Sequence, residues 1–561
     1  MNETEDRYKI ISEDYKEFIS ERNELSAERF PQTGEVQIKY NEEDSVVYVK
    51  GEFSDKDFYE LPYYSIPQVY SIQAEEYADN MSGKKGYDYP GSRLTGENVI
   101  VGFIDTGIQY TEEMFRNLDG TTRILCIWDQ TEQSGRCPER FPYGSEYTKA
   151  DIDRALMEKN PYQRVPSIDK DGHGTYMASV AVGGAVVEEN FMGIAPEAEI
   201  AVVKLKPAKA CLKQFWGIRE DSVCYQETDI LMAVSYLNQL SEKERKPLVL
   251  CLPFGTNMGG HTGSSPLSTY MDRVGRTSFR ALVTGTGNEA DKRHHFKGEI
   301  LGQDGEEMEI SVSGKEKSFC MEIWIDVPDV FSVSVTSPTG ETITNIPVWE
   351  QKKEYELIFE RTKVDIVYRI LVRNTNSELI FLKFKEPVAG IWSIKVEPVN
   401  LISGQFHAWL PLKEFTESSV VFLRAEPDGT ITSPGNTEAV TSVAFYDGQE
   451  NSIAVNSGRG YTRNKLIKPD FSAPGINIRG VDRRGNPIYR SGSDAAVSIT
   501  VGVEALLMEW LAVQGVKPDA RQITNLLILG AWRGTGFLYP NTKWGYGRLD
   551  LSHTFEQIRR L

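Results

Sequence analysis

The chain has 561 residues, which is too many for one ordinary core and predicts about two to four structural units at roughly 100–200 residues each. Apolar residues form 40% of the chain and aromatic residues 11%, a composition typical of a soluble globular protein. A formal net charge of -19 repels phosphate backbones, so the composition argues against a nucleic-acid partner.

The first residues, MNETEDRYKI, contain neither the basic region nor the apolar region of a signal peptide. No window approaches the roughly eighteen uninterrupted apolar residues of a transmembrane helix, so we expect no membrane partner. The six cysteines include no CxxC pair, and we interpret them as reduced structural residues. Together these features predict a protein that is used inside a cell or spore, or one exported by a route that its sequence does not reveal.

Residues 1–75 form a predicted N-terminal unit of mixed α and β structure. The run EDYKEFISERN, residues 13–23, has a helical pattern, whereas VQIKY and VVYVKGEF alternate like strands. The run IPQVYSIQ is typical of a closing strand. The stretch after it is rich in Gly, Asn and Ser and predicts an exposed connector.

Strands and helices then alternate through residues 76–296 and again through residues 416–561, which predicts one α/β domain with a mainly parallel sheet. Its predicted strands include VIVGFID, EIAVVKL, PLVLCLPF and RALVTGTGN. Residues 297–415, between the two parts, contain almost only strand patterns separated by turn signals. We therefore expect a β-sandwich or jelly roll inserted into the α/β domain.

Histidine is the usual general base at neutral pH, and only six histidines occur in the chain. His173 is the best candidate, because the glycines on both sides in KDGHGTYMASVAVGG allow backbone and substrate to approach closely. His407 falls in a strand of the insert and is expected to be structural. His294 and His295 follow a loop, but no third ligand with suitable spacing indicates a metal there. We predict neither a metal site nor a cofactor.

Three further residues have the chemistry that such a base requires. Asp105 ends an apolar strand in VIVGFIDTGI and can accept the Nδ1 proton of a histidine. Asn288 ends another strand in ALVTGTGNE and can donate to an oxyanion. Ser493, at the start of an apolar helix in RSGSDAAVSITVGVEALL, offers a nucleophilic hydroxyl and a backbone N–H for the same oxyanion. Each alone fits a turn or a helix cap, but their order predicts a triad of Asp105, His173 and Ser493.

At these motifs the chain resembles the subtilase family, whose triads run in the order Asp, His, Ser. The matching segments are VIVGFIDTGI, DGHGT, GIAPEAEIAVVKL, LVTGTGNE, NSGRGYTRNKLIKPDFSAPG and SGSDAA. Finer details are similar to the clostridial Csp proteases of spore germination, namely RILCIWDQT, FPYGSEYTKADIDRAL, GNEADKRHH before the insert, and the closing GYGRLDL. The resemblance implies a subtilisin-like parallel sheet flanked by helices, and a serine endopeptidase acting on protein or peptide substrates.

The resemblance also implies a role for each residue. His173 would take the proton of Ser493, and Asp105 would stabilise the imidazolium. Asn288 and the Ser493 N–H would hold the oxyanion. The first specificity pocket would be edged by Leu252, Pro253, Phe254, Gly255, Thr284, Gly285, Thr286 and Gly287.

The N-terminal unit is similar to the prodomain of the same group. It would bind the cleft through VYSIQ as a partner within the chain and be processed near Gln73 and Ala74. Such a protease would activate a precursor protein in the cytoplasm or spore of a bacterium.

Several positions depart from the family pattern. Ser491-Gly492-Ser493 stands where Gly-Thr-Ser is usual, and Pro253 lacks the N–H of the usual substrate strand. Asp494 would disfavour an oxyanion unless it points to solvent. These departures keep open a second hypothesis, a catalytically impaired pseudoprotease that acts as a sensor or scaffold in germination. A third, a carbohydrate-binding or partner-binding insert, depends on tryptophans that are more typical of a core: Trp349, Trp392 and Trp409.

Overall fold

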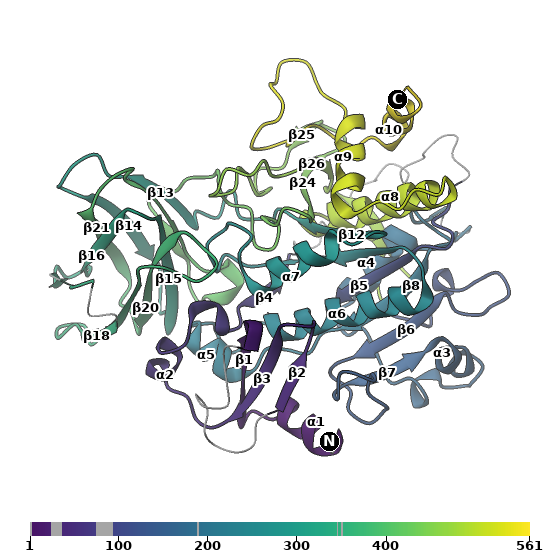
Figure 1. Ribbon diagram of the computed structural model, residues 1–561, viewed down its shortest axis with the longest axis horizontal. Coiled ribbons are helices and arrows are strands. Elements are labelled where there is room, and N and C mark those ends of the chain that lie inside the picture. Colours follow the sequence, from purple (N-terminus) through teal and green to yellow (C-terminus); the bar gives the residue numbers. More distant parts are fainter. Residues whose placement is uncertain are drawn as a thin grey trace.

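The computed structural model describes residues 3–23, 36–73, 94–187, 190–344, 346–348 and 352–560. Figure 1 shows three packed parts: a central α/β domain, a β-rich part at its left, and a small N-terminal unit below. The N-terminus lies in the small unit, and the C-terminus lies at the opposite edge, beside helices α9 (Ala520–Gly530) and α10 (Leu551–Ile558).

The α/β domain is built on a sheet in which β25, β24, β12, β10, β5, β8, β6 and β7 follow one another, with β26 paired to β24. The pairs from β24 to β6 are parallel, which confirms the predicted parallel sheet. These strands are apolar runs buried on both faces. Their bounds are β5 Ile100–Asp105, β6 Ile124–Asp129, β7 Ser145–Thr148, β8 Glu199–Lys204, β10 Leu248–Leu252, β12 Arg280–Gly285, β24 Thr441–Asp447, β25 Ser452–Ile453 and β26 Phe471–Pro474.

Helices cover both faces of this sheet. One apolar core packs α4 (His173–Val182), α8 (Ser493–Val513) and α9 on it, and a second packs α6 (Glu227–Glu244) and α7 (Pro266–Gly275) on the other face. Helix α8 is long and apolar enough to cross a membrane, but 78% of its most apolar window is buried within the molecule, as expected of a core helix. Smaller elements are α3 Lys149–Leu156, α5 Ala210–Phe215, β27 Ile478–Val481 and β28 Pro487–Arg490.

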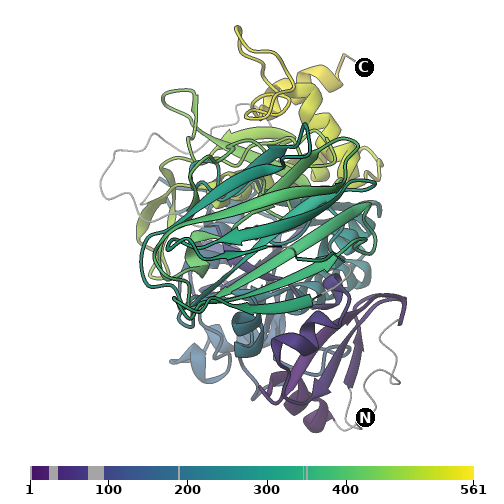
Figure 2. The ribbon, with the colours of Figure 1, turned by 90° about the vertical axis from the view of Figure 1, so that its left-hand side faces the viewer.

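The β-rich part is a sandwich of two antiparallel sheets, which stands in front of the α/β domain in Figure 2. The orders are β13-β22-β15-β20-β19-β18 and β17-β16-β21-β14-β23, and apolar side chains of both sheets fill the space between them. The sandwich extends past the predicted end at residue 415, because β23 pairs with β14. Its strands are β13 His295–Glu299, β14 Glu306–Val312, β15 Ser318–Asp326, β16 Val330–Thr336, β17 Thr342–Ile343, β18 Lys352–Glu356, β19 Lys363–Arg369, β20 Ser377–Lys385, β21 Gly390–Asn400, β22 Gln405–Trp409 and β23 Val420–Phe422.

Two of the three tryptophans considered for a binding role of the insert, Trp392 and Trp409, are buried. Trp349 lies outside the described residues. The two described side chains therefore contribute to packing and offer no exposed aromatic platform.

The N-terminal unit packs α1 (Glu3–Ile11) against a sheet of order β1-β3-β2 and continues into α2 (Asp55–Tyr59) and β4 (Val69–Ile72). The prediction of a helix over residues 13–23 is wrong, because Tyr15–Ser20 is strand β1. Tyr15 and Ile19 enter one apolar core while Phe18 enters another, so both faces of β1 are buried. A strand buried on both faces loses its alternating pattern and mimics a helical one. The sheet bounds are β1 Tyr15–Ser20, β2 Val36–Lys39 and β3 Ser45–Lys50.

Buried charges join β1 to the α/β domain. Oε1 of Glu17 lies 3.0 Å from Nζ of Lys209 and 3.7 Å from Nζ of Lys206. Burial opposes ionisation of Glu17, but Lys206 and Lys209 outweigh burial and lower its pKa to about 2. The carboxylate is therefore ionised at neutral pH, inside the interface between the two parts.

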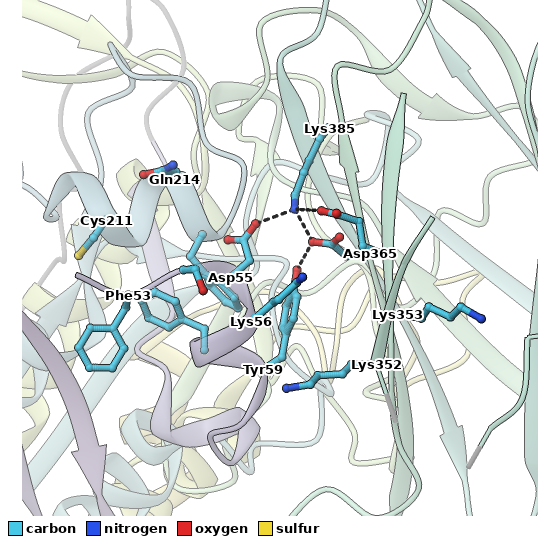
Figure 3. A pocket seen from close by; sticks show the side chains of 14 residues that line it. Phe53, Asp55, Lys56, Tyr59, Cys211, Gln214, Lys352, Lys353, Asp365 and Lys385 are labelled. Carbon is cyan, nitrogen blue, oxygen red and sulfur yellow. Dashed lines mark hydrogen bonds and ion pairs between the residues drawn. The ribbon is translucent and has the colours of Figure 1, made fainter. Parts of the chain in front are cut away.

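A second polar contact joins the N-terminal unit to the sandwich. Figure 3 shows Lys385 of β20 directed at Asp55 of α2 and at Asp365 of β19. Its Nζ lies 3.0 Å from Asp55 Oδ2 and 2.7 Å from Asp365 Oδ2, and the Tyr59 hydroxyl donates to Asp365. These groups line a pocket of about 770 Å³ where α2, α5 and β18 meet. None of the predicted catalytic residues lines this pocket, so it belongs to the junction of the three parts.

Replacing Glu17 with alanine should destabilise the protein by roughly 3–5 kcal/mol, because Lys209 would stay buried without a carboxylate partner and Lys206 would keep only Asp229. Thermal unfolding followed by circular dichroism measures this as a lower Tm. The matched control is Glu52→Ala, which removes an exposed carboxylate from the same unit and should leave the Tm nearly unchanged. Equal losses in both variants would contradict a special role for the buried charges.

Candidate active site

The carboxyl end of β5 and the first turn of α4 bring Asp105 and His173 together. Asp105 is the last residue of β5, and His173 begins α4 directly after Gly172, whose φ of 87° only glycine adopts readily. Both carboxylate oxygens of Asp105 lie 2.9 Å from Nδ1 of His173, and both side chains are buried. Asp105 therefore accepts the Nδ1 proton and fixes the ring.

The other ring nitrogen of His173 contacts Asp494. Oδ2 of Asp494 lies 3.0 Å from Nε2, and Asp494 is fully buried. Burial disfavours the imidazolium, but Asp105 and Asp494 together outweigh burial and raise the pKa of His173 to about 10. At neutral pH both ring nitrogens carry a proton, so the ring has no lone pair to take one from a hydroxyl.

The predicted nucleophile, Ser493, is directed away from the imidazole. Its Oγ accepts a hydrogen bond from the N–H of Gly287 at 3.1 Å. Its own N–H donates to Oδ1 of Asn288 at 3.1 Å, so this N–H is not the free oxyanion donor that the sequence predicted. The reason is helical phase: Ser493 and Asp494 are the first two residues of α8, and consecutive helix residues point about 100° apart. Asp494, not Ser493, faces His173.

The side-chain amide of Asn288 donates to the main-chain carbonyl of Gln73 at 3.0 Å. Gln73 follows β4, which lies between β11 (Phe254–Gly255) and β9 (Tyr225–Gln226) and runs antiparallel to both. The Gln73 N–H donates to the carbonyl of Pro253 at 3.1 Å, so Pro253 contributes an acceptor although it lacks an N–H. This is the geometry of an extended peptide whose terminal carbonyl meets an oxyanion donor.

The side chain of Gln73 fills a small pocket. Its Nε2 donates to Oγ1 of Thr432 at 2.6 Å. A β-carbon at Gly255 would collide with this amide and with Oγ1 of Thr432, and one at Gly287 would lie 2.7 Å from Cγ2 of Thr432. Gly287 also has a φ of 83°, so both positions favour glycine. Thr432 follows the sandwich in the chain, and nothing in its local sequence singles it out. Of the two predicted processing residues, Gln73 thus lies in the cleft, whereas Ala74 lies outside the described residues.

The remaining predicted pocket residues surround this cleft at different depths. Phe254 pairs with β4, whereas Leu252 and Thr284 lie behind the cleft, where the Thr284 hydroxyl donates to the Leu252 carbonyl at 2.9 Å. Gly285 borders the first turn of α8, and the Thr286 carbonyl accepts a hydrogen bond from the N–H of Thr432. Thr432 lies in residues 429–432, which we call the pocket loop. Four of these five are therefore scaffold, and Phe254 contacts the bound segment through its backbone.

Three histidines stack with Trp409 next to the pocket loop: His261 and His295 are buried, and His407 is half-buried. The ring centroids of His261 and Trp409 are 4.0 Å apart, and Nε2 of His295 lies 2.9 Å from Nδ1 of His407. His261 also bonds the carbonyl of Ile431, which precedes the pocket threonine. Within the described ranges, no three potential metal ligands come together. The stack therefore acts as packing that supports the pocket loop.

Comparisons with known proteins show which family and which solved structures this chain is similar to. Residues 96–318 match the model of the Subtilase family. The structure is similar to the CspB protease of Clostridium perfringens, at 31% sequence identity and a TM-score of 0.74, over 83% of this chain and 96% of that chain.

Curated proteins with similar sequences come from Arabidopsis thaliana. The subtilisin-like protease SBT2.2 is 28% identical over 247 residues, 38% of this chain and 27% of that protein. The subtilisin-like protease SBT4.7 is 22% identical over 519 residues, 86% of this chain and 64% of that protein. The chain thus spans less than two thirds of the length of these curated relatives.

Filling the Gln73 pocket should loosen the segment bound in the cleft. In Gly255→Val the new side chain occupies the place of the Gln73 amide, so we expect the backbone amide of Gln73 to exchange with deuterium at least roughly tenfold faster. The control is Gly302→Val, at a position with open space around its β-carbon, which should leave this exchange unchanged. Unaltered exchange in Gly255→Val would contradict the pocket assignment.

Acid should weaken the histidine stack. Burial lowers the pKa of His295 to about 3, whereas the unfolded chain takes up this proton near pH 6.5. The contribution of neutral His295 to the free energy of unfolding is complete above pH 6.5 and falls as the pH drops toward 3. The loss is about 2 kcal/mol between pH 6.5 and 5. The Tm of the wild type should therefore fall more than that of His295→Gln over this range. If the Tm of wild type and of His295→Gln fell equally with pH, this would contradict a neutral, buried His295.

Proposed function

Since the chain belongs to the subtilase family of serine peptidases, we propose that it is a self-inhibited member of that family whose substrate cleft holds its own N-terminal unit. The relatives indicate serine-type peptidase activity, and peptidases act on protein or peptide substrates. In this chain the cleft is occupied from within, and hydrolysis is impaired in the occupied state. In that state the substrate cleft binds the chain's own N-terminal unit.

The observation that carries this proposal is the hydrogen bond from Asn288 to the carbonyl oxygen of Gln73. A carbonyl bound by the oxyanion donor is in the position of a scissile carbonyl. The antiparallel pairing of β4 with β11 extends the same contact over the preceding residues. The segment thus has the contacts of a substrate on the acyl side of the bond.

Two features support an impaired hydrolytic step. The hydroxyl of Ser493 is engaged by the Gly287 N–H, and His173 is bonded on both nitrogens by carboxylates. Apolar residues of the N-terminal unit also share two cores with the rest of the protein, which supports a unit that remains bound.

A second candidate is an active serine endopeptidase with Ser493 as its nucleophile. It would cleave between Gln73 and Ala74 and then activate a precursor protein in a bacterial cytoplasm or spore. The Asp105–His173 pair and the placement of Asn288 favour it. It requires the Ser493 hydroxyl to leave Gly287 and to displace Asp494 from the imidazole.

Intact mass and a fluorophosphonate probe distinguish the two candidates. For the self-inhibited protein we expect a full-length mass and labelling no faster than in Ser493→Ala, because no hydroxyl contacts the general base. A product of residues 74–561, or rapid labelling, that disappears in Ser493→Ala would favour the endopeptidase instead. The Ser493→Ala chain serves as the matched control, since it keeps the cleft and the bound segment.

A further inference from the structure

We propose that Asp494, rather than Ser493, occupies the position of the catalytic nucleophile, and that serine at 494 would convert the protein into a peptidase that cuts after Gln73. Asp494 would then be the cause of the inhibition, so this assignment rests on the proposed function and deepens it.

Asp494 borders both reacting groups of a peptidase. Its Oδ2 lies 3.0 Å from Nε2 of His173. Its Oδ1 is on the side of the bound carbonyl: a β-carbon built on Gly492 would lie 2.9 Å from Asp494 Oδ1, 3.4 Å from the Gln73 oxygen and 3.5 Å from Nδ2 of Asn288. A single side chain thus contacts the base and also borders the space next to the carbonyl that the oxyanion donor holds, which is where a nucleophile belongs.

The helix prevents Ser493 from taking the same place. Residues 493 and 494 are consecutive in α8 and point in directions about 100° apart. Turning the helix to present Ser493 to the imidazole would carry Asp494 away from it. That rotation is opposed by the packing of α8, which is buried along almost its whole length.

The charges around His173 explain why the occupied site does not hydrolyse the peptide bond after Gln73. The ring faces Asp105 and Asp494, while the nearby Cys251 and Tyr176 are neutral because burial raises the pKa of each well above its ordinary value. Both carboxylates favour the imidazolium, which cannot serve as a general base. The Asp494 carboxylate also repels the negative charge that develops on the carbonyl during attack.

Serine at 494 would supply the missing group. Its Oγ forms a bond to the carbonyl carbon of Gln73 while its proton passes to Nε2 of His173, and Asn288 stabilises the oxyanion. Collapse breaks the C–N bond to residue 74, and the proton moves from Nε2 to the leaving amine. Water then hydrolyses the resulting ester, which releases the Gln73 carboxylate and restores the hydroxyl.

The experiment compares denatured intact masses of the full chain in matched variants. Asp494→Ser should yield fragments of residues 1–73 and 74–561. Wild type, Asp494→Asn and the double variant Asp494→Ser/His173→Ala should stay full-length, because they lack the hydroxyl or the base. A fluorophosphonate should label residue 494 of Asp494→Ser at least ~100-fold faster than wild type, the range expected for a general base. Adding Ser493→Ala to Asp494→Ser should not prevent cleavage.

Failure of this assignment and failure of the proposed function give different results. A folded, full-length Asp494→Ser protein whose Gln73 amide stays protected from deuterium exchange would overturn the assignment alone. An unprotected Gln73 amide in the wild type would overturn the proposed function. Wild-type cleavage that Ser493→Ala abolishes would show that Ser493 is the nucleophile and overturn the assignment as well.

A measurement on the wild type keeps the assignment testable if Asp494→Ser does not fold. Nitrogen-15 NMR near neutral pH should show both ring N–H groups of His173 in the wild type, identified by their loss in His173→Ala. Asp494→Asn should lower the pKa of this ring, because one of two carboxylates is removed. A single ring N–H in the wild type at pH 8 would overturn the assignment.

Discussion

The pairing of β4 with β11 and β9 is the contact on which the rest of the molecule depends. Val69–Ile72 is the middle strand of a three-stranded sheet whose outer strands belong to the α/β domain. Without it, Phe254–Gly255 and Tyr225–Gln226 would be short edges with unpaired backbone groups. The N-terminal unit is therefore part of the cleft, and the placement of the Gln73 carbonyl at Asn288 follows from strand register.

In the proposed self-inhibited protein, the electrostatics of His173 explain how a site with a base and an oxyanion donor can bind a peptide without cutting it. In a serine peptidase one carboxylate orients the imidazole and the other ring nitrogen meets a neutral hydroxyl. Here that second place holds the Asp494 carboxylate, and the pKa of His173 rises to about 10. Binding by strand pairing and by the Gln73 pocket does not depend on the protonation of the ring, so recognition survives when base catalysis does not.

Sequence patterns predicted the sheet, the inserted strands and the meeting of Asp105 with His173, because each depends on apolar runs or on the end of a parallel strand. Which of Ser493 and Asp494 faces His173 depends on helical phase, and a pattern of two adjacent polar residues at a helix start does not fix that phase. In the assignment proposed for Asp494, Gly492-Ser493-Asp494 before Ala495-Ala496 takes the order Gly-Thr-Ser-x-Ala, one residue later in the chain than the prediction that matched Ser491-Gly492-Ser493 to Gly-Thr-Ser. Thr432 was not predictable either, because only the folded chain brings it to Gln73.

Burial of apolar side chains holds the N-terminal unit on the rest of the protein, and its buried charges disfavour partly docked positions. Separating Glu17 from Lys209 would rehydrate both, so the ion pair itself adds little net free energy. The apolar residues of β1 supply the attraction, as they enter two cores shared with the rest of the protein. A shifted or half-docked unit, however, would leave Glu17 buried without a partner, at a cost of several kcal/mol. The unit is therefore either fully docked or fully released, and full docking is what delivers the Gln73 carbonyl to Asn288.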